Sequence, residues 1–553
     1  MTDVLTKTQR SFNMSMIRAE NTSPEIKFLN LLHSGGIEDF YTHPKEIIGK
    51  PDFYFPHQKL AVFIDGCFWH GCKKCFRKPQ TNKKFWVEKI TKNIKRDREV
   101  KKMLSRCGIK TIRFWEHEIK DLEAEYFTKL ISNKKGVKNK KTKIRLNALD
   151  LFAGAGGLSE GFYTAGFDIV GYIEMNKDAC ETIKTRIIYH SLKKRGKIDD
   201  YKKYLTGGVT KEKIIDKYNL YKKFSTVINT EINSHNYKKL IKSVKKSLNG
   251  KSLDIIIGGP PCQAYSYIGR ARDKNKMEGD QRNYLYKHYI EFLKALRPKL
   301  FIFENVPGLL TAGNGRHIKN IQQLARKIGY VVEYKLINAA DFGVPQSRKR
   351  IIIIGWDKKL GLKKYPDFQK VERLYSVKEF LANLPKIKSG AGIQNKRYKV
   401  KSAVLEKLGI VDKELNLLTD HISRHNSQRD LEIYKLAALL KKNGKYLKYN
   451  KLPKRLKTHK NQKGFLDRYK VVDNTSQNSH TIVAHIAKDG NHYIHPDINQ
   501  NRSLTVREAA RLQTFPDSFK FEGSRTSQFK QIGNAVPPFM ALHIARKIKK
   551  ILL

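Results

Sequence analysis

The chain has 553 residues, enough for several domains, and 40% of them are hydrophobic, which excludes a globally disordered protein. Its 110 Lys and Arg against 52 Asp and Glu give a formal net charge of +58. Charge alone does not separate a nucleic acid from an anionic membrane surface, but so large an excess favours a polyanion such as double-stranded DNA. No apolar run is as long as a membrane span and no signal peptide opens the chain, so we expect a cytoplasmic, nucleoid-associated protein with no membrane attachment.

Helical and strand patterns alternate through residues 1–133, which we interpret as the first domain. Within it we expect a capped helix over residues 24–33, a buried strand over residues 60–64 and a long basic helix over residues 82–106. Residues 134–145 are charged, lack apolar periodicity and are interpreted as a basic linker.

Three of the six cysteines, Cys67, Cys72 and Cys75, crowd into one short stretch of the first domain. In a reducing compartment such cysteines favour a metal over disulfides, and their spacing suits a tetrahedral structural Zn²⁺. That geometry needs a fourth ligand from a distant part of the chain. His117 is the best candidate once the family resemblance described below is taken into account, and His70 is the runner-up.

Strand and helix patterns alternate again after the linker, which predicts an α/β fold with a doubly wound sheet and ligands at the carboxyl ends of its strands. The short apolar runs typical of buried parallel strands are residues 253–257, 300–303 and 350–354, and a further strand is expected over residues 147–152. Residues 146–357 form the main domain of this part. Residues 358–500 are basic and irregular and are interpreted as a separate domain, and helical periodicity returns within residues 501–553.

A glycine-rich turn, Phe152-Ala-Gly-Ala-Gly-Gly157, follows the first of these strands. Glycines there allow the backbone to approach a nucleoside cofactor closely. About twenty residues further on, Glu174 ends another apolar segment, where an acid can accept hydrogen bonds from ribose hydroxyls. This combination fits several cofactors.

A lone cysteine, Cys262, follows another strand on a Gly-Gly-Pro-Pro turn. A lone cysteine is more often a packing residue, but this rigid turn is a costly way to place one. A thiol that acts as a nucleophile at neutral pH needs activation by its surroundings. Glu304 follows the next strand, and Arg348 and Arg350 introduce a third, so all three could lie near the thiol.

Six ordered motifs in residues 146–553 resemble those of the cytosine-5 DNA methyltransferases. They are Phe152-Ala-Gly-Ala-Gly-Gly157, Pro260-Pro-Cys-Gln263, Glu304-Asn-Val306, Gln346-x-Arg-x-Arg350, residues 502–516 and Gln531-Ile-Gly-Asn-Ala-Val536. The resemblance implies a Rossmann-like methyltransferase domain over residues 146–357 and 501–553, a small target-recognition domain over residues 358–500, and S-adenosylmethionine as methyl donor.

In such an enzyme Cys262 would add as a thiolate to carbon 6 of cytosine and so activate carbon 5 for methylation. Glu304 would contact ring nitrogen 3, and Arg348 and Arg350 would fix the base carbonyl. The target base must leave the helix stack, so base flipping is implied. In the target-recognition domain, Thr481 belongs to a dipeptide that resembles the family's DNA-contacting pair.

The resemblance also implies a donor pocket. Its expected residues are Phe152, Gly154, Gly156, Leu158, Glu174 for the ribose, Glu231 for the adenine, Pro260, Asn534 and Val536. Glu231 stands where the family usually has Asp, and a lysine-rich insertion at about residues 188–222 precedes it.

The first domain resembles the very-short-patch repair (Vsr) endonucleases in stretches spread from Arg10 to Glu118. That family has a restriction-endonuclease-like α/β fold and nicks DNA beside the thymine of a T:G mismatch. The implied site residues are Asp52 as the main Mg²⁺ ligand, the main chain of Ile64 as a second Mg²⁺ ligand, His70 as general base, Glu25 and Asp97 in support, and Met14, Phe68, Trp69 and Trp86 as wedges in the duplex. For the aromatic residues, core packing is the alternative. At Ile64-Asp65 this chain departs from the Thr-His pair of the family. Asp65 would place an extra charge beside the metal.

Our leading hypothesis is a bifunctional enzyme that methylates cytosine and nicks the T:G mismatches left when 5-methylcytosine deaminates. A second hypothesis makes the first domain a zinc-containing DNA-binding module that does not cut. A third makes the chain a single-chain restriction-modification enzyme that cuts unmethylated sites. Protein partners are left open, with mismatch-repair factors among the candidates.

Overall fold

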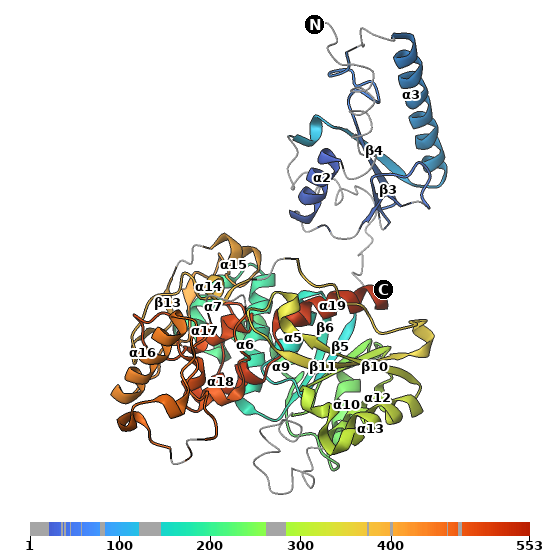
Figure 1. The fold of residues 1–553 in the computed structure, drawn as a ribbon. Helices are drawn as coiled ribbons and strands as arrows, with labels where there is room; N and C mark the ends of the chain where they lie inside the picture. The colour runs from blue at the N-terminus through green and yellow to red at the C-terminus, as the bar shows by residue number, and fades with distance from the viewer. Residues whose placement is uncertain are drawn as a thin grey trace. The chain divides into compact units, whose positions relative to one another are not determined.

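The structure is a computed structural model, and it describes residues 22–34, 37, 40–44, 46–56, 58–77, 83–120, 145–261, 284–372, 375–398, 402–459, 461, 463–473 and 478–553. The chain divides into two compact units, Met1–Lys141 and Thr142–Leu553, which are described separately (Figure 1). Among the described residues, no helix is both long enough and apolar enough to cross a membrane.

The N-terminal unit contains a four-stranded sheet in the order β1-β2-β3-β4. Strands β3 and β4 are parallel, whereas β1 and β2 pair antiparallel with their neighbours. The buried side chains of Phe28 and Leu32 on α2 pack against the sheet. The expected helix at residues 24–33, the strand at 60–64 and the basic helix at 82–106 are confirmed. The elements are α2 Ser23–Ser34, β1 Tyr41–Thr42, β2 Phe53–Phe55, β3 Leu60–Asp65, α3 Lys83–Arg106 and β4 Lys110–Trp115.

The C-terminal unit is built on a seven-stranded sheet in the order β10-β11-β9-β8-β5-β6-β7, and the predicted α/β class is confirmed. Five neighbouring strands, from β9 through β8, β5 and β6 to β7, are parallel, so their carboxyl ends lie along one edge. The strands are β5 Asn147–Leu151, β6 Asp168–Glu174, β7 Val227–Asn229, β8 Ile255–Gly258, β9 Leu300–Asn305, β10 Tyr330–Asn338 and β11 Lys349–Asp357.

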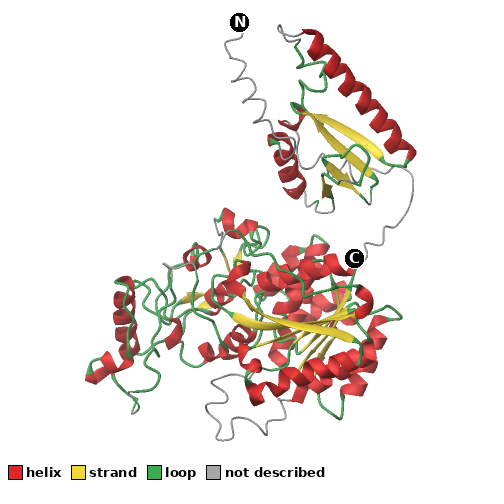
Figure 2. Ribbon diagram, turned by 45° about the vertical axis from the view of Figure 1, so that its right-hand side comes forward, coloured by secondary structure: helices red, strands yellow, loops and turns green. Residues whose placement is uncertain are grey.

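Helices cover both faces of this sheet (Figure 2). Successive residues of a strand point to opposite faces, so Leu149 packs in one core cluster and Ala148 in the other. The first cluster includes α10 Tyr237–Leu248, α12 Leu285–Leu296 and α13 Arg316–Lys327, and the second includes α5 Gly157–Thr164 and α19 Pro538–Leu552. Burial on both faces explains the uninterrupted apolar runs of β8 and β9.

The run at residues 350–354 differs from its predicted orientation. It lies in β11, which pairs antiparallel with both β9 and β10. The prediction of a parallel strand was wrong because β10 and β11 form a hairpin with a short connection, which reverses the chain direction. An apolar run that is buried on both faces has the same composition in either orientation.

The lysine-rich insertion forms short helices that pack on α6 Lys177–Lys194. Buried side chains such as Tyr201 and Leu205 form a core cluster there with Leu415 and Leu417 from the predicted target-recognition domain. The insertion helices are α7 Ile198–Leu205, α8 Lys211–Tyr218 and α9 Tyr221–Phe224. The insertion therefore shares one apolar core with α6 and with the predicted target-recognition domain.

Residues 358–500 contain short elements and long connections. A core cluster joins side chains of this region, such as Phe380 and Ile482, with Phe515 and Phe529 from the C-terminal segment. The elements here and after are α14 Val377–Leu381, β12 Gly392–Ile393, β13 Lys396–Arg397, α15 Ala403–Lys407, β14 Leu417–Leu418, β15 His421–Ile422, α16 Gln428–Lys442, α17 Val506–Leu512 and α18 Arg525–Asn534. The irregular region and the C-terminal helices thus share one core.

Candidate active sites

Two glycines at the carboxyl end of β8 allow very close packing of three strand ends. A Cβ atom on Gly258 would lie 1.9 Å from the carbonyl oxygen of Leu151, and one on Gly259 would lie 1.8 Å from that of Glu304. Only glycine fits between these backbones. The Asn305 side chain then donates a hydrogen bond to the Pro260 carbonyl at 3.2 Å. The turn that leads to Cys262 is therefore fixed beside Glu304, while Cys262 itself lies outside the described residues.

Glu304 and Arg350 form an ion pair on the neighbouring strands β9 and β11. Arg350 Nε lies 3.0 Å from Glu304 Oε1, and both side chains are largely buried. Arg348 is placed differently, because its fully buried guanidinium donates to the carbonyl oxygens of Ile482 at 2.7 Å and Gly533 at 3.1 Å. Two of the three residues that we expected near the base therefore contact each other, and the third binds main chain.

The glycine-rich turn after β5 has three residues with left-handed backbone conformation. Phe152, Gly154 and Gly156 have φ angles of 58°, 55° and 80°. A Cβ on Gly154 would meet no atom within 4 Å, so this face of the turn is open. Glu174, at the end of β6, accepts hydrogen bonds from the main-chain N–H groups of Gly154 and Asn176, both at 2.8 Å. Burial raises the pKa of the Glu174 carboxyl, against the effect of these hydrogen bonds.

The other residues expected at the donor pocket surround this turn or follow neighbouring strands. Leu158 is buried on α5, and Val536 is buried beside Gly157. Glu231 follows β7 and Asn534 ends α18, and both side chains are exposed. An open glycine turn, a carboxylate fixed at the next strand end and exposed polar side chains beyond it fit a nucleoside cofactor.

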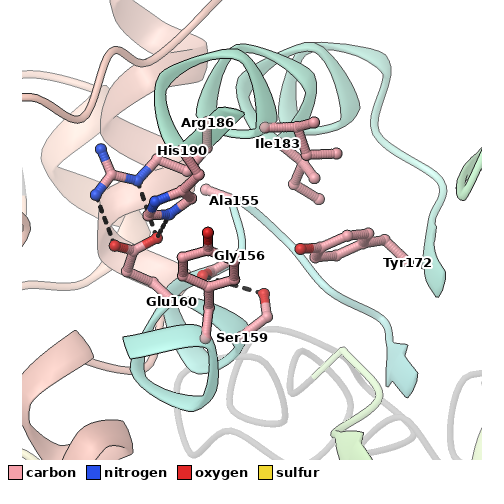
Figure 3. A pocket seen from close by; sticks show the side chains of 10 residues that line it. Ala155, Gly156, Ser159, Glu160, Tyr172, Ile183, Arg186 and His190 are labelled. Carbon is pink, nitrogen blue, oxygen red and sulfur yellow. Dashed lines mark hydrogen bonds and ion pairs between the residues drawn. The ribbon is translucent and has the colours of Figure 1, made fainter. Parts of the chain in front are cut away.

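A buried charge cluster lies behind the glycine turn, between α5 and α6, and lines a small pocket with Ala155 and Gly156 (Figure 3). Glu160 accepts two hydrogen bonds from Arg186, at 2.6 and 2.9 Å, and His190 Nε2 lies 2.9 Å from Glu160 Oε2. Burial works to raise the pKa of Glu160, but the charges of Arg186 and His190 hold it well below its usual range. Sequence analysis missed this cluster, which fixes α5 and so the turn that precedes it.

In the N-terminal unit, Glu25, His43 and Asp52 each direct one potential metal ligand atom to within 4.8 Å of the others. His43 Nε2 lies 3.3 Å from Glu25, and His43 Nδ1 lies 3.8 Å from Asp52. Asp52 Oδ2 also accepts the Ile64 main-chain N–H at 2.6 Å. Burial raises the pKa of the Asp52 carboxyl to about 6. Two carboxylates meet the preference of Mg²⁺ for oxygen ligands, and His43 is a member that the sequence did not reveal.

His70 belongs to a second cluster, which also explains the unusual Asp65. His70 Nδ1 lies 2.6 Å from Asp97 Oδ2. Arg113 on β4 donates to both oxygens of Asp65, at 2.6 and 2.8 Å, and to Asp97 at 3.1 Å. The guanidinium therefore balances the extra charge of Asp65 and joins it to the partner of His70.

The three clustered cysteines meet His117, the fourth ligand that we expected. The Sγ atoms of Cys67, Cys72 and Cys75 lie 3.1, 3.8 and 3.4 Å from His117 Nδ1. Three thiols and one imidazole nitrogen at these separations could hold a metal ion, and this set of donors is one that tetrahedral zinc accepts. His70, the alternative ligand, contacts Asp97 instead.

Phe68, Trp69 and Trp86 form a half-buried aromatic cluster. Their ring centroids lie 5.2 to 5.8 Å apart. The Lys89 ammonium lies 5.3 Å from the centroid of Trp69. Met14, the fourth expected wedge residue, lies outside the described residues. The three rings therefore pack on each other and keep part of their surface exposed.

Comparison with protein families gives two matches. Residues 146–211 and 210–550 match the model for C-5 cytosine-specific DNA methylase. Residues 2–77 match the model for DNA mismatch endonuclease Vsr. The second match includes Asp52, His70 and the three cysteines, and it ends before Asp97 and His117.

Two relatives, M.Bpa9945I and M1.HphI, agree with the first match. The Type II methyltransferase M.Bpa9945I of Bacillus paralicheniformis is 42% identical over 73% of this chain and 98% of its own length. The Type II methyltransferase M1.HphI of Haemophilus parahaemolyticus is 30% identical over 73% of this chain and 87% of its own length. A prophage-encoded E. coli protein described as a DNA modification methyltransferase aligns at 24% identity with a TM-score of 0.49, over 74% of this chain and 99% of that structure. The chain belongs to the C-5 cytosine-specific DNA methylase family and carries a segment at its N-terminus that matches the Vsr endonuclease model.

Proposed function

We propose that this cytosine-5 DNA methyltransferase also nicks DNA at T:G mismatches. The observation that carries the proposal is that each family match coincides with a set of reactive side chains in its own unit. In the C-terminal unit the set is Glu304 with Arg350 beside the Cys262 turn. In the N-terminal unit it is the carboxylates of Glu25 and Asp52 near the His70 cluster.

In the methyltransferase, Cys262 forms a bond from its sulfur to carbon 6 of a flipped cytosine, which raises electron density at carbon 5. S-adenosylmethionine, when bound, supplies an electrophilic methyl group. Glu304 binds the base at ring nitrogen 3, and its ion pair with Arg350 holds the carboxylate in place. Once carbon 5 carries the methyl group and the donor has left as a neutral thioether, loss of the carbon 5 proton to water and release of the Cys262 thiolate restore the aromatic ring.

Glu174 holds the donor through its ribose. Replacing Glu174 with glutamine is expected to weaken donor binding by about tenfold or more, because hydrogen bonds to charged groups contribute about 1.5–3 kcal/mol. Isothermal titration with S-adenosylmethionine measures the change. Glu212→Gln, an exposed acid on α8, is the control and should bind the donor as the wild type does. Equal affinity in the two variants would contradict the role of Glu174.

In the nuclease, Asp52 and Glu25 would hold Mg²⁺, which would stabilise the charge of the cleaved phosphate and activate a water. His70 takes a proton from that water at Nε2, because Nδ1 faces Asp97. Arg113 fixes Asp97 and Asp65 beneath it. Phe68, Trp69 and Trp86 enter the duplex where the mismatch weakens stacking.

Cys67, Cys72, Cys75 and His117 bind a structural Zn²⁺ that joins the turn after β3 to the segment after β4. We expect one zinc per chain in the purified protein and a much reduced content in Cys72→Ser, measured by atomic emission. Loss of zinc should make the N-terminal unit sensitive to protease, because structural zinc contributes on the order of 10 kcal/mol in small domains. Cys107→Ser, at an exposed cysteine, should keep its zinc. Wild-type zinc content in Cys72→Ser would refute the assignment.

The names of the relatives favour a second candidate function. M.Bpa9945I and M1.HphI are Type II methyltransferases, so the chain could work within a restriction-modification system. The N-terminal unit would then cut matched, unmethylated DNA. Cleavage of an unmethylated homoduplex at the sequence that the C-terminal unit methylates would favour this function.

A further inference from the structure

Two segments far apart in the sequence are joined by main-chain hydrogen bonds in the C-terminal unit. One precedes β11, and the other lies in the predicted target-recognition domain. The Ser347 N–H donates to Ser479 O at 2.8 Å, and the Ser479 N–H donates to Pro345 O at 2.9 Å. Thr481 Oγ1 donates to Ser347 O at 2.5 Å. Residues 479–482, which we call the recognition segment, are therefore fixed to the segment that leads into β11, the strand that carries Arg350.

Gln346 and Arg348 bind the next residue, Ile482, at both of its main-chain groups. Gln346 Oε1 accepts the Ile482 N–H at 3.1 Å, and Arg348 donates to Ile482 O at 2.7 Å. All three side chains are fully buried. In an extended chain, residues two apart point to the same side, so the Gln-x-Arg spacing suits this pair of contacts.

The same two side chains also reach the C-terminal segment. Arg348 donates to Gly533 O at 3.1 Å, next to Asn534 of the expected donor pocket. Gln346 Nε2 donates to Leu512 O and to the side chain of Gln513, both at 2.9 Å. Two residues beyond Arg348, Arg350 holds Glu304. A single extended segment thus contacts the recognition segment, the C-terminal helices and the acid of the active site.

We propose that Gln346 and Arg348 are positioning residues that couple recognition of the DNA sequence to methyl transfer. They hold Ile482, and Thr481 beside it, at a fixed place relative to Glu304. The sequence-based expectation placed Arg348 on the cytosine carbonyl, whereas its hydrogen bonds to Ile482 and Gly533 commit the guanidinium to protein carbonyls. Loss of either side chain leaves a buried main-chain group without its partner and loosens the recognition segment.

The test uses the full-length variants Gln346→Met, Arg348→Lys and Arg348→Met, and the double variant with both methionines. Each methylates plasmid DNA with S-adenosylmethionine, and base-resolution sequencing identifies every methylated cytosine and its flanking bases. We expect a broadened set of flanking sequences in each variant. The KM for DNA should rise about tenfold or more in Arg348→Met, where buried charged hydrogen bonds are lost, and less in Gln346→Met, where neutral ones are lost. Arg348→Lys should lie between the wild type and Arg348→Met. Arg326→Met, an exposed arginine on α13, is the control and should keep wild-type selectivity.

The double variant should lose less than the product of the two single effects, because both side chains hold the same residue. A direct contact between Arg348 and the base would give a different result, with the same set of methylated sites, an unchanged KM for DNA and only a lower kcat. That result, or independent effects in the double variant, would overturn the proposal. Circular dichroism identifies any variant that fails to fold. If Arg348→Met fails, Gln346→Met and Arg348→Lys decide, and wild-type selectivity in both would overturn the coupling role.

Discussion

Replacing Cys262 with serine should reduce methyl transfer by at least about a thousandfold, as loss of a catalytic nucleophile does in other enzymes. A serine hydroxyl has nearly the same shape, but it is a far weaker nucleophile toward carbon 6 of cytosine at neutral pH. Transfer of a tritiated methyl group from S-adenosylmethionine to duplex DNA measures the rate. Donor affinity should not change, because the glycine turn and Glu174 remain intact.

Cys107→Ser is the matched control for this experiment. Cys107 is exposed and lies in the N-terminal unit, outside the group of Cys67, Cys72, Cys75 and His117, so its loss should leave methyl transfer unchanged. Turnover of the Cys262→Ser variant near the wild-type rate would show that carbon 5 is activated in another way. Loss of donor binding in that variant would show a structural defect instead.

Asp52→Ala should abolish nicking and leave methyl transfer intact. Removing a principal metal ligand removes charge stabilisation worth several kcal/mol, so we expect a loss of about a thousandfold or more. The assay follows conversion of a supercoiled plasmid with one T:G mismatch to the open circle in the presence of Mg²⁺. The same preparation should still methylate DNA at the wild-type rate, because the reactive residues of the two units are separate sets.

Glu99→Ala is the control, since Glu99 is an exposed acid on α3. This variant should nick as fast as the wild type. Undiminished nicking by Asp52→Ala would assign the cleavage to a contaminating nuclease or to another metal site.

Secondary structure could be predicted best where burial leaves a continuous apolar run or a helical periodicity in the sequence. The strand at residues 60–64, the helix at 82–106 and the runs at 253–257 and 300–303 all became the expected elements. The orientation of β11 could not be predicted, because residues 350–354 are apolar on both faces whichever way the strand runs. The shared core of Phe380 with Phe515 was equally hidden, because it joins segments more than a hundred residues apart.

For the candidate sites, short motifs predicted which chemistry to expect, and the fold shows which partners complete it. Cys67, Cys72 and Cys75 signal a metal by spacing alone, and the structure places His117 among them. His43 and Arg113 carry no local signal, because each acts through residues that are distant in sequence. The partners of Arg348 were missed for the same reason.

A single chain with both activities would have a chemical logic. Deamination of 5-methylcytosine gives thymine opposite guanine, so a methyltransferase creates the sites at which such mismatches later arise. The Asp65–Arg113 pair supports this account, because Arg113 neutralises the extra charge that Asp65 places beside the expected metal site. A nickase attached to the methyltransferase would start repair at those positions.

The most direct test of this account uses the wild-type protein, Mg²⁺ and three duplexes. Each duplex contains the sequence that the protein methylates, and the three differ only at the target position. The first has T:G at the target position, the second has methylated C:G and the third has unmethylated C:G. Denaturing gels with separately labelled strands show which strand is cut and where. The account predicts a nick in the thymine-containing strand of the T:G duplex and intact strands in the other two. An uncut T:G duplex, or cleavage of the unmethylated C:G duplex alone, would contradict it.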